Sequence, residues 1–130
     1  LDHIKGIIES KYCIFTEGSF DYFRGKYHDL SIVANLGIKF NTLLKLLIDR
    51  LDVVFTAYDN DETGKKNMSM IDSLHPTVYH IQFDPIPKDD GFVKGDLDEA
   101  LKDTAKAEKL RQEIEKRLKF KGTKLPHIKI

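Results

Sequence analysis

The sequence predicts an α/β fold, in which helices flank a mainly parallel sheet of four strands. Short apolar runs alternate along the chain with segments that repeat apolar residues at helical spacing. The first three runs are nearly continuous, which is typical of strands covered on both faces, and all four are rich in β-branched and aromatic residues. Such alternation predicts parallel strands joined by right-handed crossovers.

Each expected element follows from its local pattern. The strands are expected at residues 12–16, 30–35, 53–58 and 77–83. The helices are expected at residues 1–11, 19–27, 40–51, 62–74 and 104–120, with Asn41 or Thr42 as a cap of the third. Two prolines and a glycine in residues 84–93 predict a mobile loop, and "KGTKLPHIKI" at the end predicts a frayed basic tail. We expect one domain over residues 1–103, followed by a charged C-terminal helix and tail over 104–130.

Composition limits the classes of protein that this chain can represent. It has 130 residues, 21 Lys+Arg and 21 Asp+Glu, so its formal net charge is zero. This balance argues against a dedicated nucleic-acid-binding module, although nucleic acid can still be a substrate. Cys13 is the sole cysteine, which excludes an intrachain disulfide and a zinc site built on several thiolates. No apolar run approaches the length of a membrane span, so we expect a cytoplasmic protein without membrane contact. The first residue is Leu1, from which we expect a fragment of a longer chain.

Acidic residues cluster where the expected strands end. Glu17 directly follows the strand 12–16, and Asp21 lies one helical turn further on. Asp59 and Asp61 directly follow the strand 53–58. A third pair, Asp96 and Asp98 in "KGDLDEAL", opens a later helix. Because ligands of such folds bind beyond the carboxyl ends of parallel strands, we expect these three clusters to meet at one edge of the sheet.

The acidic clusters allow two interpretations, helix capping and cation binding. Aspartates can cap the helices that follow them and favour the positive end of the helix dipole, which suffices for any one cluster alone. Three clusters at one edge favour a bound cation, because adjacent carboxylates repel each other unless a positive charge lies between them. Carboxylates without His or Cys partners suit Mg²⁺ or Mn²⁺.

Four segments together resemble the Toprim domain, a Rossmann-like catalytic module shared by primases, topoisomerases and some nucleases. They are "EGSFD", "VANLGIKF", "YDNDETGKK" and "KGDLDEAL", within residues 11–103. The match is closest to bacterial and phage primases, which carry Glu-Gly-x-x-Asp, then Asp-x-Asp-x-x-Gly-x-Lys, then Lys-Asp-Pro-Asp. The Arg-Glu-Gly-Glu that follows the Asp-x-Asp of topoisomerases is absent. The third segment departs from the primase pattern, because Gly95 separates Lys94 from Asp96 and Leu97 replaces the proline.

The resemblance implies roles for individual residues. It implies that Glu17, Asp59 and Asp61 are catalytic and hold Mg²⁺ or Mn²⁺. Asp21, Asp96 and Asp98 would be further metal ligands or outer-shell acids. Lys65 and Lys66 would contact phosphate or nucleic acid, although as helix residues they can equally be ordinary surface charges.

The implied activity is metal-dependent nucleotidyl transfer, which makes RNA primers on a DNA template. The partners would be nucleoside triphosphates and single-stranded DNA, and a replicative helicase would bind through regions absent from this sequence. Two alternatives remain. The chain can be a stand-alone Toprim nuclease that hydrolyses phosphodiesters, with Glu17 as general base, or a module that binds metal and nucleotide but is inactive in isolation.

Overall fold

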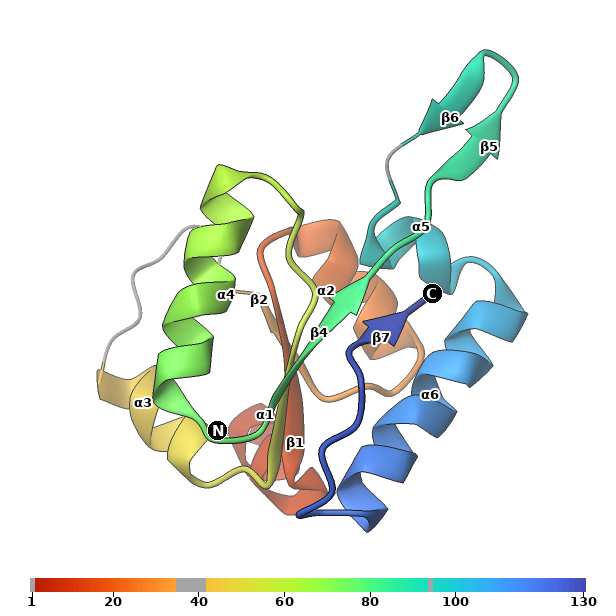
Figure 1. Ribbon diagram of the computed structural model, residues 1–130. Helices are drawn as coiled ribbons and strands as arrows, with labels where there is room; N and C mark the ends of the chain where they lie inside the picture. Colours follow the sequence, from red (N-terminus) through yellow and green to blue (C-terminus); the bar gives the residue numbers. More distant parts are fainter. Residues whose placement is uncertain (1, 35–41, 94) are drawn as a thin grey trace.

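The protein is built on a parallel sheet of five strands in the order β2-β1-β3-β4-β7 (Figure 1). The structure is a computed structural model and describes residues 2–34, 42–93 and 95–130. The strands are β1 Tyr12–Thr16, β2 Ile32–Ala34, β3 Val53–Thr56, β4 Val78–Gln82 and β7 Ile128–Lys129. Each neighbouring pair in the sheet is parallel, so all the carboxyl ends lie at one edge. The predicted α/β fold with a mainly parallel sheet is confirmed.

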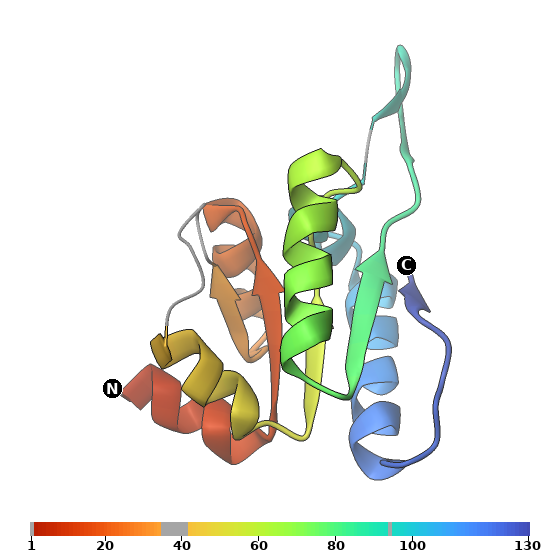
Figure 2. The ribbon, with the colours of Figure 1, turned by 60° about the vertical axis from the view of Figure 1, so that its left-hand side comes forward.

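Helices cover both faces of the sheet, giving three layers (Figure 2). One face carries α1 Asp2–Ser10, α3 Thr42–Asp49 and α4 Glu62–Leu74. The other carries α2 Ser19–Tyr27, α5 Leu97–Leu101 and α6 Thr104–Lys119. The expected cap Asn41 lies outside the described residues, and α3 begins at Thr42. Within the described ranges, no helix combines the length and apolar composition needed to cross a membrane.

Alternation along the strands divides the core into two hydrophobic clusters. In β1, Cys13 and Phe15 point to the layer of α1, α3 and α4, whereas Ile14 points to the layer of α2, α5 and α6. In β3, Val54 joins the first cluster and Phe55 the second. These five side chains are fully buried, and each of the four other than Cys13 contributes about 1.5–3 kcal/mol through removal of apolar surface from water. Burial on both faces explains why the strands are continuous apolar runs.

The C-terminal segment is part of the fold, so the expectation of a frayed tail is wrong. Ile128 lies in β7, which pairs with β4, and both Ile128 and Ile130 are buried in the same cluster as Leu110 of α6. Arg117 of α6 fixes the approach to this strand. Its guanidinium donates to the Pro126 carbonyl at 2.5 Å and lies 4.7 Å from the centre of the Tyr79 ring.

Residues 84–93 also differ from the expectation, because they form a hairpin and not an irregular loop. The strands β5 Ile86–Lys88 and β6 Gly91–Val93 pair antiparallel, and Gly91 has a φ of 124°, a value that favours glycine. The hairpin projects from the body of the molecule beyond the carboxyl edge of the sheet (Figure 1).

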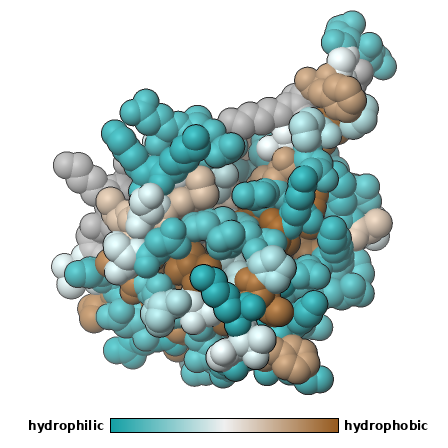
Figure 3. Space-filling view, viewed as in Figure 1, coloured by the Kyte–Doolittle hydropathy of each residue, from teal (hydrophilic) through white to brown (hydrophobic). Residues whose placement is uncertain are grey.

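Figure 3 shows that the face over α4 and α6 carries mostly hydrophilic side chains, as expected for a solvated surface.

Candidate functional site

The first acidic segment joins β1 to α2. Glu17 follows the last residue of β1, and Gly18 precedes α2 with extended backbone angles. Asp21 lies in the first turn of α2, where a carboxylate is stabilised by the positive end of the helix dipole. Thr16, buried at the end of β1, donates its hydroxyl to Asp21 Oδ2 at 3.1 Å. The strand end therefore orients the Asp21 carboxylate directly.

The second acidic segment follows β3. Asp61 caps α4, because its Oδ1 accepts the backbone N–H of Gly64 at 2.7 Å. The first turn of α4 lies so close to the preceding backbone that a Cβ on Gly64 would be 1.8 Å from the Asp59 carbonyl oxygen. Only glycine allows this approach, which holds Asp59 at the sheet edge. The capping interpretation is correct for Asp61.

The third acidic segment precedes α5. Asp96 Oδ1 accepts the backbone N–H of Glu99 at 2.8 Å, so this residue also acts as a cap. Leu97, which stands where the primase pattern has proline, is completely buried in the core. A Cβ on the extra residue Gly95 would lie 2.4 Å from the Asp84 carbonyl oxygen, so glycine permits close contact with the base of the hairpin.

The three segments meet at one pocket of about 250 Å³ at the carboxyl edge of the sheet. Four predicted acids line it: Glu17, Asp21, Asp59 and Asp96. Phe20 of α2 forms part of the wall. Asp61 and Asp98 lie outside this lining, and Lys65 and Lys66 are exposed on α4. The meeting of acids from all three segments, predicted from the order of strands and carboxylates, is therefore observed.

Asp21 is electrostatically unusual. Burial raises the pKa of its carboxyl group to about 6, and the negative charges of Asp96 and Asp59 act in the same direction. Two hydrogen bonds oppose this rise, one from the Asp98 backbone N–H at 2.8 Å and one from the Thr16 hydroxyl. Neither donor carries a full positive charge, and no cationic side chain is among the described residues that line the pocket, so this described lining has an excess of negative charge.

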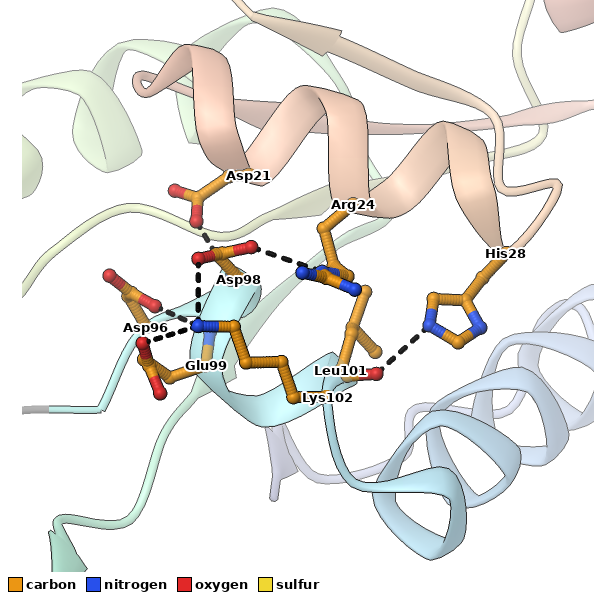
Figure 4. Close-up of polar contacts among 8 residues, drawn as sticks. All are labelled: Asp21, Arg24, His28, Asp96, Asp98, Glu99, Leu101 and Lys102. Carbon is orange, nitrogen blue, oxygen red and sulfur yellow. Dashed lines mark hydrogen bonds and ion pairs between the residues drawn. The ribbon is translucent and has the colours of Figure 1, made fainter.

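Asp98 is placed differently, as Figure 4 shows. Its carboxylate accepts a hydrogen bond from Arg24 Nε at 3.1 Å and lies 3.7 Å from Lys102 Nζ. The pair joins α5 to α2, and the Asp98 backbone N–H reaches back to Asp21. His28, at the end of α2, bonds the Leu101 carbonyl at 2.9 Å and adds a second link between the two helices.

The donors around the pocket match a hard divalent cation in type, because they are carboxylate oxygens. Burial, and to a smaller extent the charges of Asp96 and Asp59, raises the pKa of Asp21, and a cation bound in the pocket would oppose both effects. Across the part of the chain that the structure describes, no three His, Cys, Asp or Glu side chains already form a ligand cluster. Side-chain rotation in this open pocket would be needed to bring several carboxylates onto one ion.

Three neighbours of the acids were missed from the sequence. Thr16 is the last residue of an apolar strand, and nothing in the sequence distinguishes it from other strand threonines. Arg24 could have been found, because it lies one turn after Asp21 in the same helix. Phe20, between Gly18 and Asp21, carries no pattern that separates a pocket wall from a core position.

Comparison with solved structures gives a match to "Crystal Structure of the Aquifex aeolicus primase (Zinc Binding and RNA Polymerase Domains)". The two share 26% sequence identity with a TM-score of 0.60, over 88% of this chain. The fold is primase-like. No family model matches the sequence, and no curated protein does.

The primase-like region is a small part of the matching structure, since this chain spans 28% of that one. The match nevertheless includes most of the present chain. The predicted likeness to primases is thus supported by the arrangement of the backbone as well as by short motifs.

Proposed function

We propose that this chain carries out metal-dependent nucleotidyl transfer within a primase-like protein, joining ribonucleotides into an RNA primer on single-stranded DNA. The observation that carries the proposal is the pocket where acids from three segments meet, on a fold similar to that of a protein described as having RNA polymerase domains. Nucleoside triphosphates and a DNA template are the substrates that this assignment requires.

The proposed ligands of Mg²⁺ or Mn²⁺ are Glu17, Asp59 and Asp61, with Asp21 and Asp96 as nearby acids. Such an ion would polarise phosphate oxygens and offset the charge that develops during transfer. Glu17 and Asp59 line the pocket, which supports their assignment. Asp61 holds the start of α4 through Gly64 and so fixes the segment that presents Asp59.

Other residues would position the site. Arg24 neutralises Asp98, and through the Asp98 backbone this pair helps to hold Asp21. We assign Asp98 to this positioning role in preference to metal binding, because two cations already contact its carboxylate. Lys65 and Lys66, exposed on the first half of α4, would steer incoming phosphates.

The decisive measurement is Mn²⁺ affinity of the chain by electron paramagnetic resonance. We expect Asp59→Asn and Glu17→Gln each to weaken binding at least tenfold while the circular dichroism spectrum is retained. Asp49→Asn, on the exposed surface of α3, is the matched control and should leave the affinity unchanged. Wild-type affinity in both pocket variants would refute the proposed metal site.

Activity is tested separately with a single-stranded DNA template, ribonucleoside triphosphates and Mg²⁺ or Mn²⁺. The proposal expects products that require template and nucleotides and that are lost in Asp59→Asn. Cleavage of labelled single-stranded DNA or RNA without nucleotides would instead identify a nuclease. Metal and nucleotide binding without either reaction would identify a binding module.

A further inference from the structure

The outer face of α2 carries a row of three exposed aromatic rings. Phe20, Phe23 and Tyr27 are 78%, 65% and 77% exposed. Their spacing of three and four residues places them on one side of the helix. Single exposed apolar side chains are common on proteins, but a contiguous row of large rings marks a binding surface.

The opposite side of α2 fixes this orientation. Gly25 packs so closely on the sheet that a Cβ there would lie 2.7 Å from Ile32 Cδ1. Tyr22 packs against the hydrophobic cluster of that face. Rotation of α2 to bury the row would separate these contacts, so the rings remain outside.

The row is continuous with the acidic pocket. Phe20 lines that pocket together with Glu17 and Asp59. Phe20 also lines a second, more open hollow of about 250 Å³, whose other walls include Phe23 and Tyr27. The two hollows therefore share one ring, and a ligand that leaves the acidic pocket at Phe20 meets the remaining two.

Cationic side chains flank the rings. The Arg24 guanidinium lies 5.9 Å from the centre of the Tyr27 ring and is held by Asp98. On the other flank, exposed Lys26 borders a hollow beside α1. Aromatic rings, a guanidinium and a nearby lysine are the groups with which proteins bind single-stranded nucleic acid, through base stacking and phosphate contact.

We propose that Phe20, Phe23 and Tyr27 form a base-stacking track for single-stranded nucleic acid that leads to the acidic pocket. The proposal rests on the function proposed above for that pocket, because Phe20 lines it and would be within reach of a base attached to a phosphate held there. From Phe20 to Tyr27 the helix rises about 10 Å. This length matches about three base steps of about 3.4 Å each.

The absence of tryptophan from the sequence allows a direct test. Phe23→Trp introduces a single fluorophore into the track, and stacking of a base on the indole quenches its emission. We expect saturable quenching by an oligothymidylate of about eight nucleotides, within the usual range of single-strand sites. Phe120→Trp, at an exposed ring just after α6, is the matched control and should show no saturable quenching.

Substitution by leucine separates stacking from general apolar contact. Phe23→Leu and Tyr27→Leu keep an apolar side chain but remove the ring. Each should weaken oligothymidylate binding, measured by fluorescence anisotropy, about tenfold with an unchanged melting temperature. Absence of quenching, or full affinity in the leucine variants, would overturn the proposal, the latter because it would show apolar docking of the kind a protein partner uses.

The proposal of the base-stacking track and the proposal of the metal site can be refuted separately. Phe23→Leu should retain wild-type Mn²⁺ affinity. Asp59→Asn combined with Phe23→Trp should lose Mn²⁺ and still show quenching of the indole in metal-free buffer. Mn²⁺ binding without quenching would overturn the track alone. Quenching by the Phe23→Trp protein, with no Mn²⁺ binding when Asp59 is intact, would overturn the metal site alone.

Discussion

Asp21 and Asp98 lie next to each other, joined by a hydrogen bond from the Asp98 backbone to the Asp21 carboxylate, yet their charges are balanced in opposite ways. Asp98 contacts Arg24 and Lys102. Asp21 receives hydrogen bonds from neutral donors and faces Asp59 and Asp96. Among the residues that the structure describes, cations compensate the charge of Asp98 but not that of Asp21.

At one edge of the sheet, this contrast distinguishes a carboxylate that stabilises the fold from carboxylates that are available to bind a cation. A carboxylate paired with arginine ties α5 to α2 and contributes to stability in the absence of any ligand. Carboxylates that face one another raise the free energy of the ion-free protein, and binding of a cation relieves that cost. A divalent ion would therefore lower the free energy of the folded protein most by binding beside Asp21, Asp59 and Asp96, the uncompensated half of this edge.

The largest effect is expected when the backbone that presents Asp59 is disturbed. In Gly64→Ala, the new methyl group would overlap the Asp59 carbonyl, so the turn must open. We expect the free energy of unfolding to fall by about 3 kcal/mol or more in urea denaturation. Gly6→Ala is the control, because its added Cβ would meet no atom within 4 Å apart from its chain neighbours and the backbone of its own helix. It should stabilise α1 by about 0.5–1 kcal/mol, and a neutral Gly64→Ala would show that the close approach is unimportant.

Removing the uncompensated charge should stabilise the metal-free chain. The pKa of Asp21 rises to about 6 in the folded state, from an ordinary value near 4. Folding therefore favours the protonated form, and this contribution is fully present below about pH 4 and is lost as the pH rises through 6. At pH 7, Asp21→Asn should raise the free energy of unfolding by about 1–2 kcal/mol, less than the full shift implies because solvent partly screens this carboxyl group. The gain should disappear below about pH 4, and an equal gain at both pH values would exclude a titration effect.

Breaking the ion pair between Arg24 and Asp98 should lower the free energy of unfolding. Arg24→Met removes the nearer of the two cationic partners of the largely buried Asp98 and leaves Lys102 at 3.7 Å, so we expect a loss of about 1–2 kcal/mol of stability. A double-mutant cycle with Asp98→Asn measures the coupling, which should be about 1 kcal/mol. Zero coupling would mean that the contact does not contribute to the link between α2 and α5.

The layered fold could be predicted because every layer leaves a strong local pattern. Strands buried on both faces have to be apolar throughout, and the first two acidic clusters directly follow such strands in the chain. Strand β7 was not predicted, since its two residues lie in a short, basic segment that becomes a strand only by pairing with β4. The hairpin was predictable in part, because Asp90-Gly91 is a turn pair, but two prolines argued against strands.

The sequence predicted which acidic residues gather at the site, but it did not predict which side chains contact them. The position of Glu17, Asp21, Asp59 and Asp96 at one edge was predicted from the parallel direction of the strands and from the place of these acids after them in the chain. The pairing of Asp98 with Arg24 spans 74 residues, and no local pattern specifies it. Which acids remain uncompensated therefore depended on tertiary structure.

The smallest effect is expected at the lysines of α4, which lie near the uncompensated half but are exposed. Lys65→Gln and Lys66→Gln should each change the free energy of unfolding by less than about 0.5 kcal/mol. If they steer phosphate, each should weaken the affinity for ATP in Mg²⁺ by about two- to fivefold, the range of an exposed ion pair. Lys116→Gln, in the last turn of α6, is the control and should leave nucleotide affinity unchanged. Equal affinities in all three variants would limit nucleotide recognition to the acidic pocket and to groups other than these lysines.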